Sequence, residues 1–213
     1  VYLMARTVKK SEERRAEIVT AALELFLEKD YHNTTMQDVI NKVNIAKGTI
    51  YHYFKSKEEL LDAVVALTVQ TYVDQVKRQL AGTSGDALNR MHVLIKASDA
   101  SDGQADLLAR LHRPGNIGLH TRQLALTVSM LAPLYAQIIE QGCEEGIFQP
   151  GEALSKAEML LAGIQFLTDC GCNPWATEDI ERRIAAIPAI MECLLGAPKG
   201  SFAFILNLKN KGS

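Results

Sequence analysis

The stretch TTMQDVINKVNIAKGTIYHYFKSK, residues 34–57, has the pattern of a helix, a tight turn and a second helix. Either Thr34 or Thr35 can cap the first helix, and Thr35 with Asp38 has the spacing of a capping box. The apolar residues that follow recur at the spacing of one helical face, which predicts a buried stripe. This stripe consists of Met36, Val39, Ile40 and Val43.

The turn and the second helix are predicted from the residues that come next. Asn44 belongs to one of the few non-glycine types that tolerate the left-handed conformation of a sharp turn. We expect a short helix over residues 46–54, with Ile50 and Phe54 facing inward because they are four residues apart. Lys47, Thr49, Tyr51 and His52 fall on other faces, and Tyr53 fits either side.

Charge is distributed unevenly over the same stretch. No acidic residue occurs between Asp38 and Glu58, whereas Lys42, Lys47, Lys55 and Lys57 do, with three aromatic residues among them. A basic second helix after a tight turn suits docking into the major groove of DNA, with phosphate contacts at its flanks. The spacing alone leaves a second interpretation open, which is a solvated lysine face on an ordinary helical hairpin.

Residues 12–65, and above all AKGTIYHYFKSKEELLDAV (46–64), resemble the N-terminal DNA-binding domain of the TetR family of transcriptional regulators. Three positions depart from the family pattern. Asp30 and Asn44 stand where glycine is common, and both residue types tolerate left-handed backbone. Ala46 stands where a Ser or Thr often caps the recognition helix, which gives up a cap worth about 1 kcal/mol.

The resemblance implies roles for individual residues in a DNA interface. Lys47, Tyr51 and Lys57 match family positions that hold the DNA backbone. Thr49 and His52 would face the bases, and Gly48 would let the two backbones approach. The complete predicted DNA-binding set is Thr34, Thr35, Lys47, Gly48, Thr49, Tyr51, His52, Tyr53 and Lys57.

Helical periodicity and glycine breaks along the remaining chain predict an all-α protein with two domains. The net charge of −2 means that any DNA binding must rest on a local basic patch. The N-terminal arm could add phosphate contacts or have no role. We expect a flexible basic arm at 1–10, a helix-turn-helix domain at 11–56, a connecting helix at 57–81, a ligand-binding and dimerisation domain at 82–198 and a tail at 199–213.

The second domain is, by the resemblance, a helical domain that binds a small hydrophobic effector and forms a homodimer. Residue type and position suggest effector contacts at Met91, Leu94, Leu108, Leu111, His112, His120, Met130, Leu134, Gln165, Phe166 and Trp175, within a wider set that includes Leu131, Tyr135 and Met159. The dimer interface is expected at Met159, Gly163, Phe166, Ile184, Ile187 and Met191, although these apolar residues could instead form the core of a monomer.

Other classes of protein find little support in the sequence. The nucleophile-elbow, P-loop, dinucleotide-binding and zincin motifs do not occur, so we expect neither an enzyme nor a metal or other cofactor. The four cysteines do not form a disulfide framework, and no apolar segment has the length of a signal peptide or a membrane span. These features favour a soluble, cytoplasmic protein.

The sequence therefore predicts a ligand-responsive regulator of transcription. It would bind a palindromic DNA operator as a dimer, with repression favoured over activation, and a small hydrophobic molecule would release it. An alternative is a regulator of the same fold that activates, or that responds to a protein partner or to thiol oxidation. A third is a helical enzyme or carrier whose basic hairpin is incidental.

Overall fold

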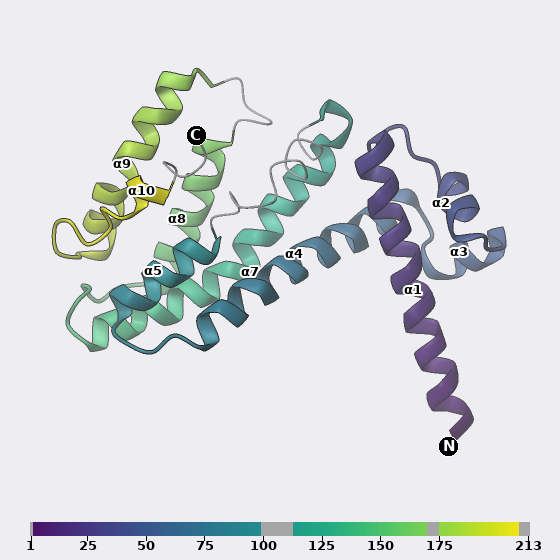
Figure 1. Ribbon diagram of the computed structural model, residues 1–213, viewed down its shortest axis with the longest axis horizontal. Helices are drawn as coiled ribbons and strands as arrows, with labels where there is room; N and C mark the ends of the chain where they lie inside the picture. Colours follow the sequence, from purple (N-terminus) through teal and green to yellow (C-terminus); the bar gives the residue numbers. More distant parts are fainter. Residues whose placement is uncertain (1, 99–112, 170–174, 209–213) are drawn as a thin grey trace. The chain divides into compact units, whose positions relative to one another are not determined.

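The computed structural model describes residues 2–98, 113–169 and 175–208, and every regular element within them is helical (Figure 1). The chain divides into two compact units. The N-terminal unit contains Val1–Val69 and Leu107–Gln123, and the C-terminal unit contains Gln70–Asp106 and Leu124–Ser213. In the described parts of the chain, no helix is long and apolar enough to cross a membrane.

The first helix of the N-terminal unit, α1 (Tyr2–Lys29), begins earlier than the sequence analysis expected. Residues 1–10 were expected to form a flexible arm outside the helix-turn-helix domain. The structure instead continues the helix back to Tyr2. The segment from Tyr2 to Lys10 contains no glycine or proline, so no residue in it interrupts the helix.

The helix-turn-helix consists of α2 (Met36–Val43) and α3 (Lys47–Tyr53), as predicted. The Thr35 hydroxyl accepts from the Asp38 N–H, and the Asp38 carboxylate accepts from the Thr35 N–H, which completes the capping box. Asn44 closes α2 in the left-handed conformation, with a φ of 56°, as expected from its residue type. Asp30 is also left-handed, with a φ of 68°.

The core of the N-terminal unit forms where apolar faces of these helices meet the start of α4 (Lys57–Ala81). At the start of α4, Ser56 accepts from the Glu59 N–H, and the Glu59 carboxylate accepts from the Lys55 N–H. The deeply buried apolar side chains of the unit include Ile18, Ala22, Phe26, Val39, Ile50, Phe54, Leu60, Leu61, Val64 and Leu119.

A short segment expected in the second domain belongs to the N-terminal unit instead. This segment comprises the 3-10 turn η1 (Pro114–Asn116) and the first residues of α7 (Ile117–Glu144). Its polar groups bond to the turn between α1 and α2, which accounts for its place in that unit. Residues 99–112, which precede this segment, lie outside the described residues.

The C-terminal unit is a layered arrangement of helices, including the later parts of α4 and α7. Its remaining helices are α5 (Ala87–Ser98), α8 (Ala153–Thr168), α9 (Thr177–Leu195) and the single-turn α10 (Ile205–Leu208). Pro133 lies inside α7 and Pro188 inside α9 without ending either helix. Helix α8 packs along α9, and α10 also packs on α9, so the predicted tail is folded through α10.

Candidate functional sites

The surface of α3 is the strongest candidate for DNA contact. Ile50 is fully buried and fixes the helix against the core, while Lys47, Tyr51 and His52 are exposed on its other faces. Tyr53 is half-buried, with its ring edge-on to that of His52 at 5.1 Å. The Ala46 side chain makes no cap, as its residue type implies. The exposed residues are those that the sequence analysis assigned to base and phosphate contacts.

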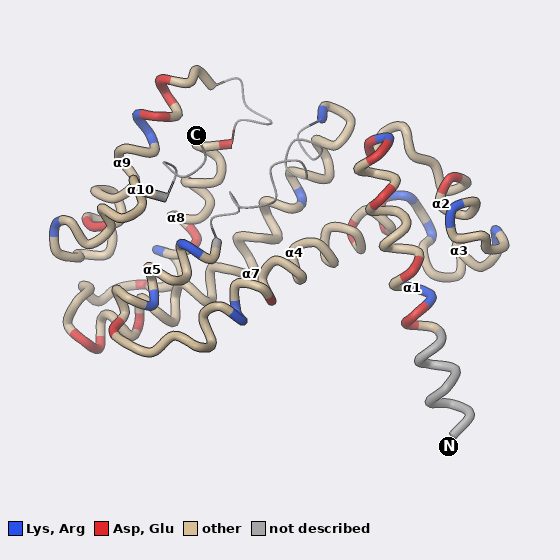
Figure 2. The backbone as a smooth tube through the Cα atoms, viewed as in Figure 1, with Lys and Arg blue, Asp and Glu red and all other residues tan. Residues whose placement is uncertain are grey.

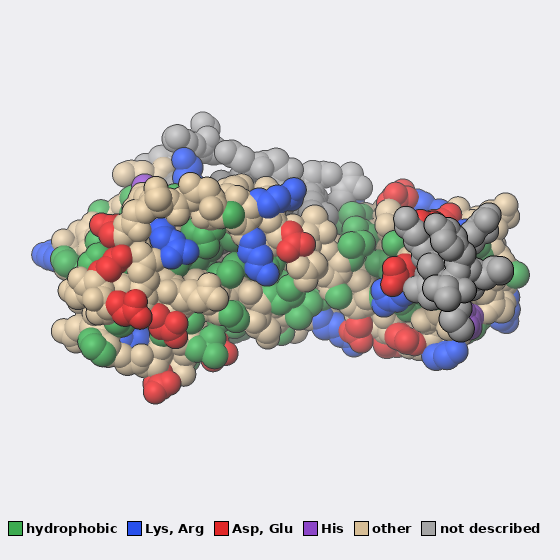
Figure 3. Space-filling model, turned by 90° about the horizontal axis from the view of Figure 1, so that it is seen from below, with side chains coloured by type: hydrophobic (Ala, Val, Ile, Leu, Met, Phe, Trp, Pro, Cys, Tyr) green, Lys and Arg blue, Asp and Glu red, His purple; other side chains and the backbone are tan. Residues whose placement is uncertain are grey.

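Positive charge accompanies this surface. From the middle of α2 to the start of α4 the backbone carries Lys but no acidic residue (Figure 2). Lys42 is paired with Glu24 at 2.9 Å and Glu28 at 3.3 Å, so its charge is partly compensated. Lys47 and Lys55 are exposed. On the face drawn in Figure 3, Lys and Arg side chains lie among Asp and Glu side chains. The basic patch is therefore local.

Gly48 is not required by the interior of the protein. A Cβ atom added at this position would meet nothing within 4 Å, and its φ lies outside the left-handed range. A glycine near the start of an exposed helix reduces helix propensity by up to about 1 kcal/mol relative to alanine. Packing among the described residues therefore does not explain the glycine at position 48. A binding partner whose surface approaches α3 closely would explain it.

Two members of the predicted DNA-binding set are used inside the protein. Thr34 is 1% exposed, and its hydroxyl donates to the carbonyl oxygens of Leu25 and Asp30. The Lys57 ammonium donates to the carbonyl oxygens of Tyr31, His32 and Thr34, at 2.8, 3.3 and 2.8 Å. It also lies 4.2 Å from the centroid of the Tyr31 ring. Any phosphate contact by Lys57 would compete with these three bonds.

The capping box of α2 carries the most perturbed carboxyl group in the described N-terminal unit. Asp38 accepts hydrogen bonds from the Lys29 ammonium at 2.8 Å and from the hydroxyl and N–H of Thr35. These bonds favour the ionised carboxylate and lower the pKa of Asp38 from 3.8 to about 2. The start of α2 is thereby held by a charged group down to low pH.

A brace formed by residues 113–116 supports the turn that precedes α2. The Asn116 side chain accepts from the Tyr31 N–H at 2.6 Å and donates to the Phe26 carbonyl oxygen at 3.2 Å. Arg113 donates to the carbonyl oxygens of Leu27 and Glu28 at the end of α1. No local sequence pattern predicts the brace, because it joins segments about 85 residues apart.

A cavity of about 330 Å³ lies within the C-terminal unit and is mostly apolar. It is bounded by five helices and by the later part of α4, and its described polar side chains come from two tyrosines, Gln165 and Thr168. Its described lining residues are Tyr72, Ile95, Leu131, Tyr135, Leu160, Leu161, Ile164, Gln165, Thr168, Ile184, Ile187, Met191 and Ile205.

Among the eleven predicted effector contacts, only Gln165 is a described lining residue of this cavity. Met91 and Leu94 are buried in the core of the unit, and Met130 and Leu134 each precede a residue that does line the cavity. Successive residues of a helix point about 100° apart, so this displacement reflects helical phase. His120 is buried in the N-terminal unit, Phe166 is exposed with Trp175 edge-on to it, and Leu108, Leu111 and His112 lie outside the described residues.

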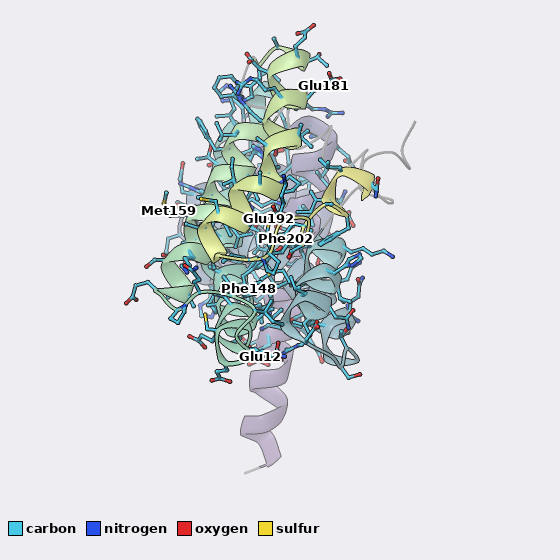
Figure 4. The ribbon with its side chains drawn as sticks, turned by 90° about the vertical axis from the view of Figure 1, so that its left-hand side faces the viewer. Glu12, Phe148, Met159, Glu181, Glu192 and Phe202 are labelled. Atoms are coloured by element: carbon cyan, nitrogen blue, oxygen red, sulfur yellow. The ribbon has the colours of Figure 1, made fainter. Side chains whose placement is uncertain are left out.

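An exposed apolar groove runs between α8 and α9. It is lined by Met159 and Gly163 from α8 and by Ile187 and Ile190 from α9, among others. Met159 is 72% exposed and points away from the unit (Figure 4). Three of the predicted dimer residues, Met159, Gly163 and Ile187, therefore line one surface groove. Phe166 is 55% exposed outside the groove, whereas Ile184 and Met191 line the cavity of about 330 Å³, and Met191 is 2% exposed.

The described residues contain no group of three or more His, Cys, Asp or Glu side chains suited to a metal ion. Cys143 is half-buried and Cys193 is exposed. Cys170 and Cys172 lie outside the described residues.

Comparison with known proteins extends these observations to most of the chain. The family model for bacterial regulatory proteins of the tetR family matches residues 18–64, and the model for a tetracyclin repressor-like C-terminal domain matches residues 99–190. A TetR-family regulator of known structure from Pectobacterium atrosepticum is 18% identical and superposes with a TM-score of 0.68, over 90% of this chain and 98% of that one. At this identity the likeness concerns the fold.

Two relatives agree with the family models. The HTH-type transcriptional regulator HbdR of Aromatoleum sp. (strain CIB) is 30% identical over 102 residues, which cover 48% of this chain and 44% of HbdR. The HTH-type transcriptional repressor KstR2 of Mycobacterium tuberculosis is 26% identical over 161 residues, which cover 69% of this chain and 75% of KstR2. The matched part thus spans less than half of HbdR and three quarters of KstR2. The resemblance seen in the sequence is confirmed by these two family models, and the protein belongs to the TetR family of transcriptional regulators.

Proposed function

We propose that this protein is a dimeric repressor that binds a palindromic operator and releases it when a small hydrophobic molecule enters the C-terminal unit. The observation that carries the proposal is the mostly apolar cavity of about 330 Å³, which has the size and composition of a small-molecule site. Repression is favoured because KstR2, which is matched over 75% of its length, is a transcriptional repressor.

Recognition of DNA would be performed by α3 in the major groove. Thr49 and His52 would read base edges, and Lys47, Tyr51 and Lys55 would contact phosphates at the flanks of the groove. A side chain at position 48 would meet none of the described residues, which supports a close approach of DNA as the reason for Gly48. Selection of bound sequences from random double-stranded DNA tests this role. We expect an inverted repeat, with half-sites about one helical turn apart or a multiple of it. Recovery of unrelated sequences would contradict operator-specific binding.

Dimerisation would use the groove between α8 and α9. A two-fold axis beside this groove would pair the apolar residues of two copies in a four-helix arrangement. Sedimentation of Met159→Glu tests the assignment, because a buried charge at such an interface is costly. Leu154→Glu on the same helix is the matched control, since Leu154 is 47% exposed but does not line the groove. If the Met159→Glu protein still sediments as a dimer, the groove is not part of the dimer interface.

Release of DNA would follow from linkage between the two binding events. The effector can lower operator affinity only to the extent that it binds the DNA-free state more tightly, and DNA must weaken effector binding by the same factor. Screening of hydrophobic compounds for loss of operator binding identifies candidates. Calorimetry with and without operator then tests the coupling, and equal effector affinities in the two titrations would rule it out.

A bulky residue in the cavity should abolish the response without affecting apo DNA binding. The suitable position is Gln165, which lines the cavity and is only half-buried. Met130, which residue type alone suggested, does not line it. We expect the Gln165→Trp protein to stay bound to its operator in the presence of the effector compound. A fully retained response would place the effector elsewhere.

A further inference from the structure

The last described residues of the chain form a cover, residues 197–208, that folds back onto the C-terminal unit. Gly196 ends α9 in the left-handed conformation, with a φ of 64°, and Gly200 makes a second turn with a φ of 91°. The Glu192 carboxylate on α9 accepts from the N–H of Gly200 at 2.7 Å and from the N–H of Phe202 at 3.4 Å. One acidic side chain therefore holds the turn of the cover against α9.

Aromatic contacts fix the cover beyond this turn. Phe202 is fully buried, and its ring centroid lies 6.3 Å from that of Phe148 (Figure 4). Phe148 in turn packs where a Cβ on Gly142 would clash with its ring, so its position is closely defined. The ring of Phe204 stacks on that of His92 in α5, with centroids 4.0 Å apart. The cover is thus attached to both α9 and α5.

The contacts of the cover with α9 and α5 fix the position of Ile205, the first residue of α10. Ile205 lines the cavity together with Ile95 of α5 and Met191 of α9, whereas the next residue, Leu206, is 43% exposed. The geometry points to a specificity role: we propose that the cover is the removable wall of the effector cavity and that Ile205 limits the size of the molecule it admits. This inference rests on the proposed function of the cavity.

The cover is the part of the wall that opens at the lowest cost. The other described lining residues lie on helices of at least twelve residues, whereas α10 has four. A single helical turn gains little from its own backbone bonds and is held by tertiary contacts, here Glu192 and the aromatic rings. Loosening the Glu192 contact should therefore speed exchange of a bound molecule without altering the rest of the lining.

Two pairs of variants of the full-length chain test the inference, with Nile red as the probe of the cavity. Ile205→Trp would fill the space beside the cover, and Leu206→Trp adds the same ring at a neighbouring exposed site. Glu192→Ala removes the acceptor of two backbone N–H groups. Glu181→Ala removes the same charge from an exposed position on the same helix (Figure 4). Circular dichroism and thermal melting confirm that each variant is folded.

We expect Ile205→Trp to weaken Nile red binding about tenfold or more, since overpacking a filled site is costly, and Leu206→Trp to change it less than about twofold. Glu192→Ala should raise the dissociation rate of the dye in stopped-flow measurements, and Glu181→Ala should not. If Ile205→Trp and Glu192→Ala both behave like the unmodified protein, the cover is not a wall of the site.

A fifth variant separates failure of this inference from failure of the proposed cavity. Gln165→Trp fills the cavity from α8, away from the cover. Loss of dye binding in Gln165→Trp with normal binding in Ile205→Trp would overturn the role of the cover while supporting the cavity. Normal binding in both variants, or no binding by the unmodified protein, would overturn the cavity as the hydrophobic site, and the role of the cover with it.

Discussion

Asn116 accepts a hydrogen bond from the backbone N–H of Tyr31 at 2.6 Å, although the two residues are 85 positions apart in the chain. The Asn116 side chain is fully buried, and its amide also donates to the Phe26 carbonyl oxygen. The turn that leads into the helix-turn-helix thus obtains part of its hydrogen bonding from a segment beyond α5. The position of α2 and α3 depends on that segment as well as on their own sequence.

Replacement of Asn116 by Ala should destabilise the N-terminal unit by about 1–3 kcal/mol, because it removes the buried amide that accepts from the part-buried N–H of Tyr31. Urea denaturation measures the loss. The control is Asn41→Ala on exposed α2, which should change stability by no more than about 0.5 kcal/mol. Equal effects of the two substitutions would show that the bond from Asn116 contributes nothing specific.

Lys47 and Lys57 should differ in how their loss affects DNA binding. Sequence resemblance assigned both to phosphate contacts, which predicts that each alanine variant lowers the salt slope by about one unit. The bonds from Lys57 to three carbonyl oxygens change this expectation. Lys57→Ala should destabilise the unit and weaken DNA binding, but leave the dependence of DNA affinity on salt concentration unchanged. Lys47→Ala should make that dependence less steep. DNA titrations at several salt concentrations measure this dependence for both variants. A less steep salt dependence for Lys57→Ala would show that Lys57 contacts a phosphate.

Gly48→Ala should have opposite effects on stability and on DNA binding. The added methyl group meets nothing inside the protein and improves helix propensity, so the free energy of unfolding should rise by up to about 1 kcal/mol. Operator affinity should fall, because the methyl group would lie where the DNA backbone approaches. Thermal melts and operator titrations measure the two effects. Undiminished affinity would show that DNA does not approach this position closely.

His52→Ala should change which bases are preferred at particular operator positions. A side chain that reads a base edge contributes about 1–3 kcal/mol of discrimination at that position. His52 is exposed on α3, and its ring lies edge-on to Tyr53. Binding to a set of single-substitution operators tests this role. A uniform loss over the whole set would instead assign His52 to the phosphate contacts.

The contribution of Asp38 to stability should depend on pH in a defined direction. Its pKa is about 2 in the folded protein and ordinarily 3.8, so the folded state favours the ionised form. The resulting stabilisation is complete above the ordinary pKa and is lost as the pH falls from about 4 towards 2. The difference in unfolding free energy between the unmodified protein and Asp38→Asn should therefore shrink over this range. A constant difference down to pH 2.5, about the lower end of that window, would contradict the assigned pKa.

The helix-turn-helix could be predicted from sequence because its determinants are local. The capping box of Thr35 and Asp38 and the left-handed Asn44 depend on neighbouring residues, and all were found as expected. The inward direction of Ile50 and Phe54 follows from helical periodicity, and both are fully buried. The motif from Ala46 to Val64 was specific enough to identify the family.

Only the tertiary structure decided which side chains are used inside the protein and which remain available. Lys57 is bonded to a turn more than twenty residues earlier, and Asn116 to one 85 residues earlier. The sequence suggested Met130, Leu131, Leu134 and Tyr135 alike as pocket residues, and only Leu131 and Tyr135 line the cavity, because the rotational phase of α7 is set by packing. The place of Ile205 in the cavity wall depends on a turn held by Glu192. A sequence pattern records local spacing, whereas these relationships arise when segments distant in the chain come into contact.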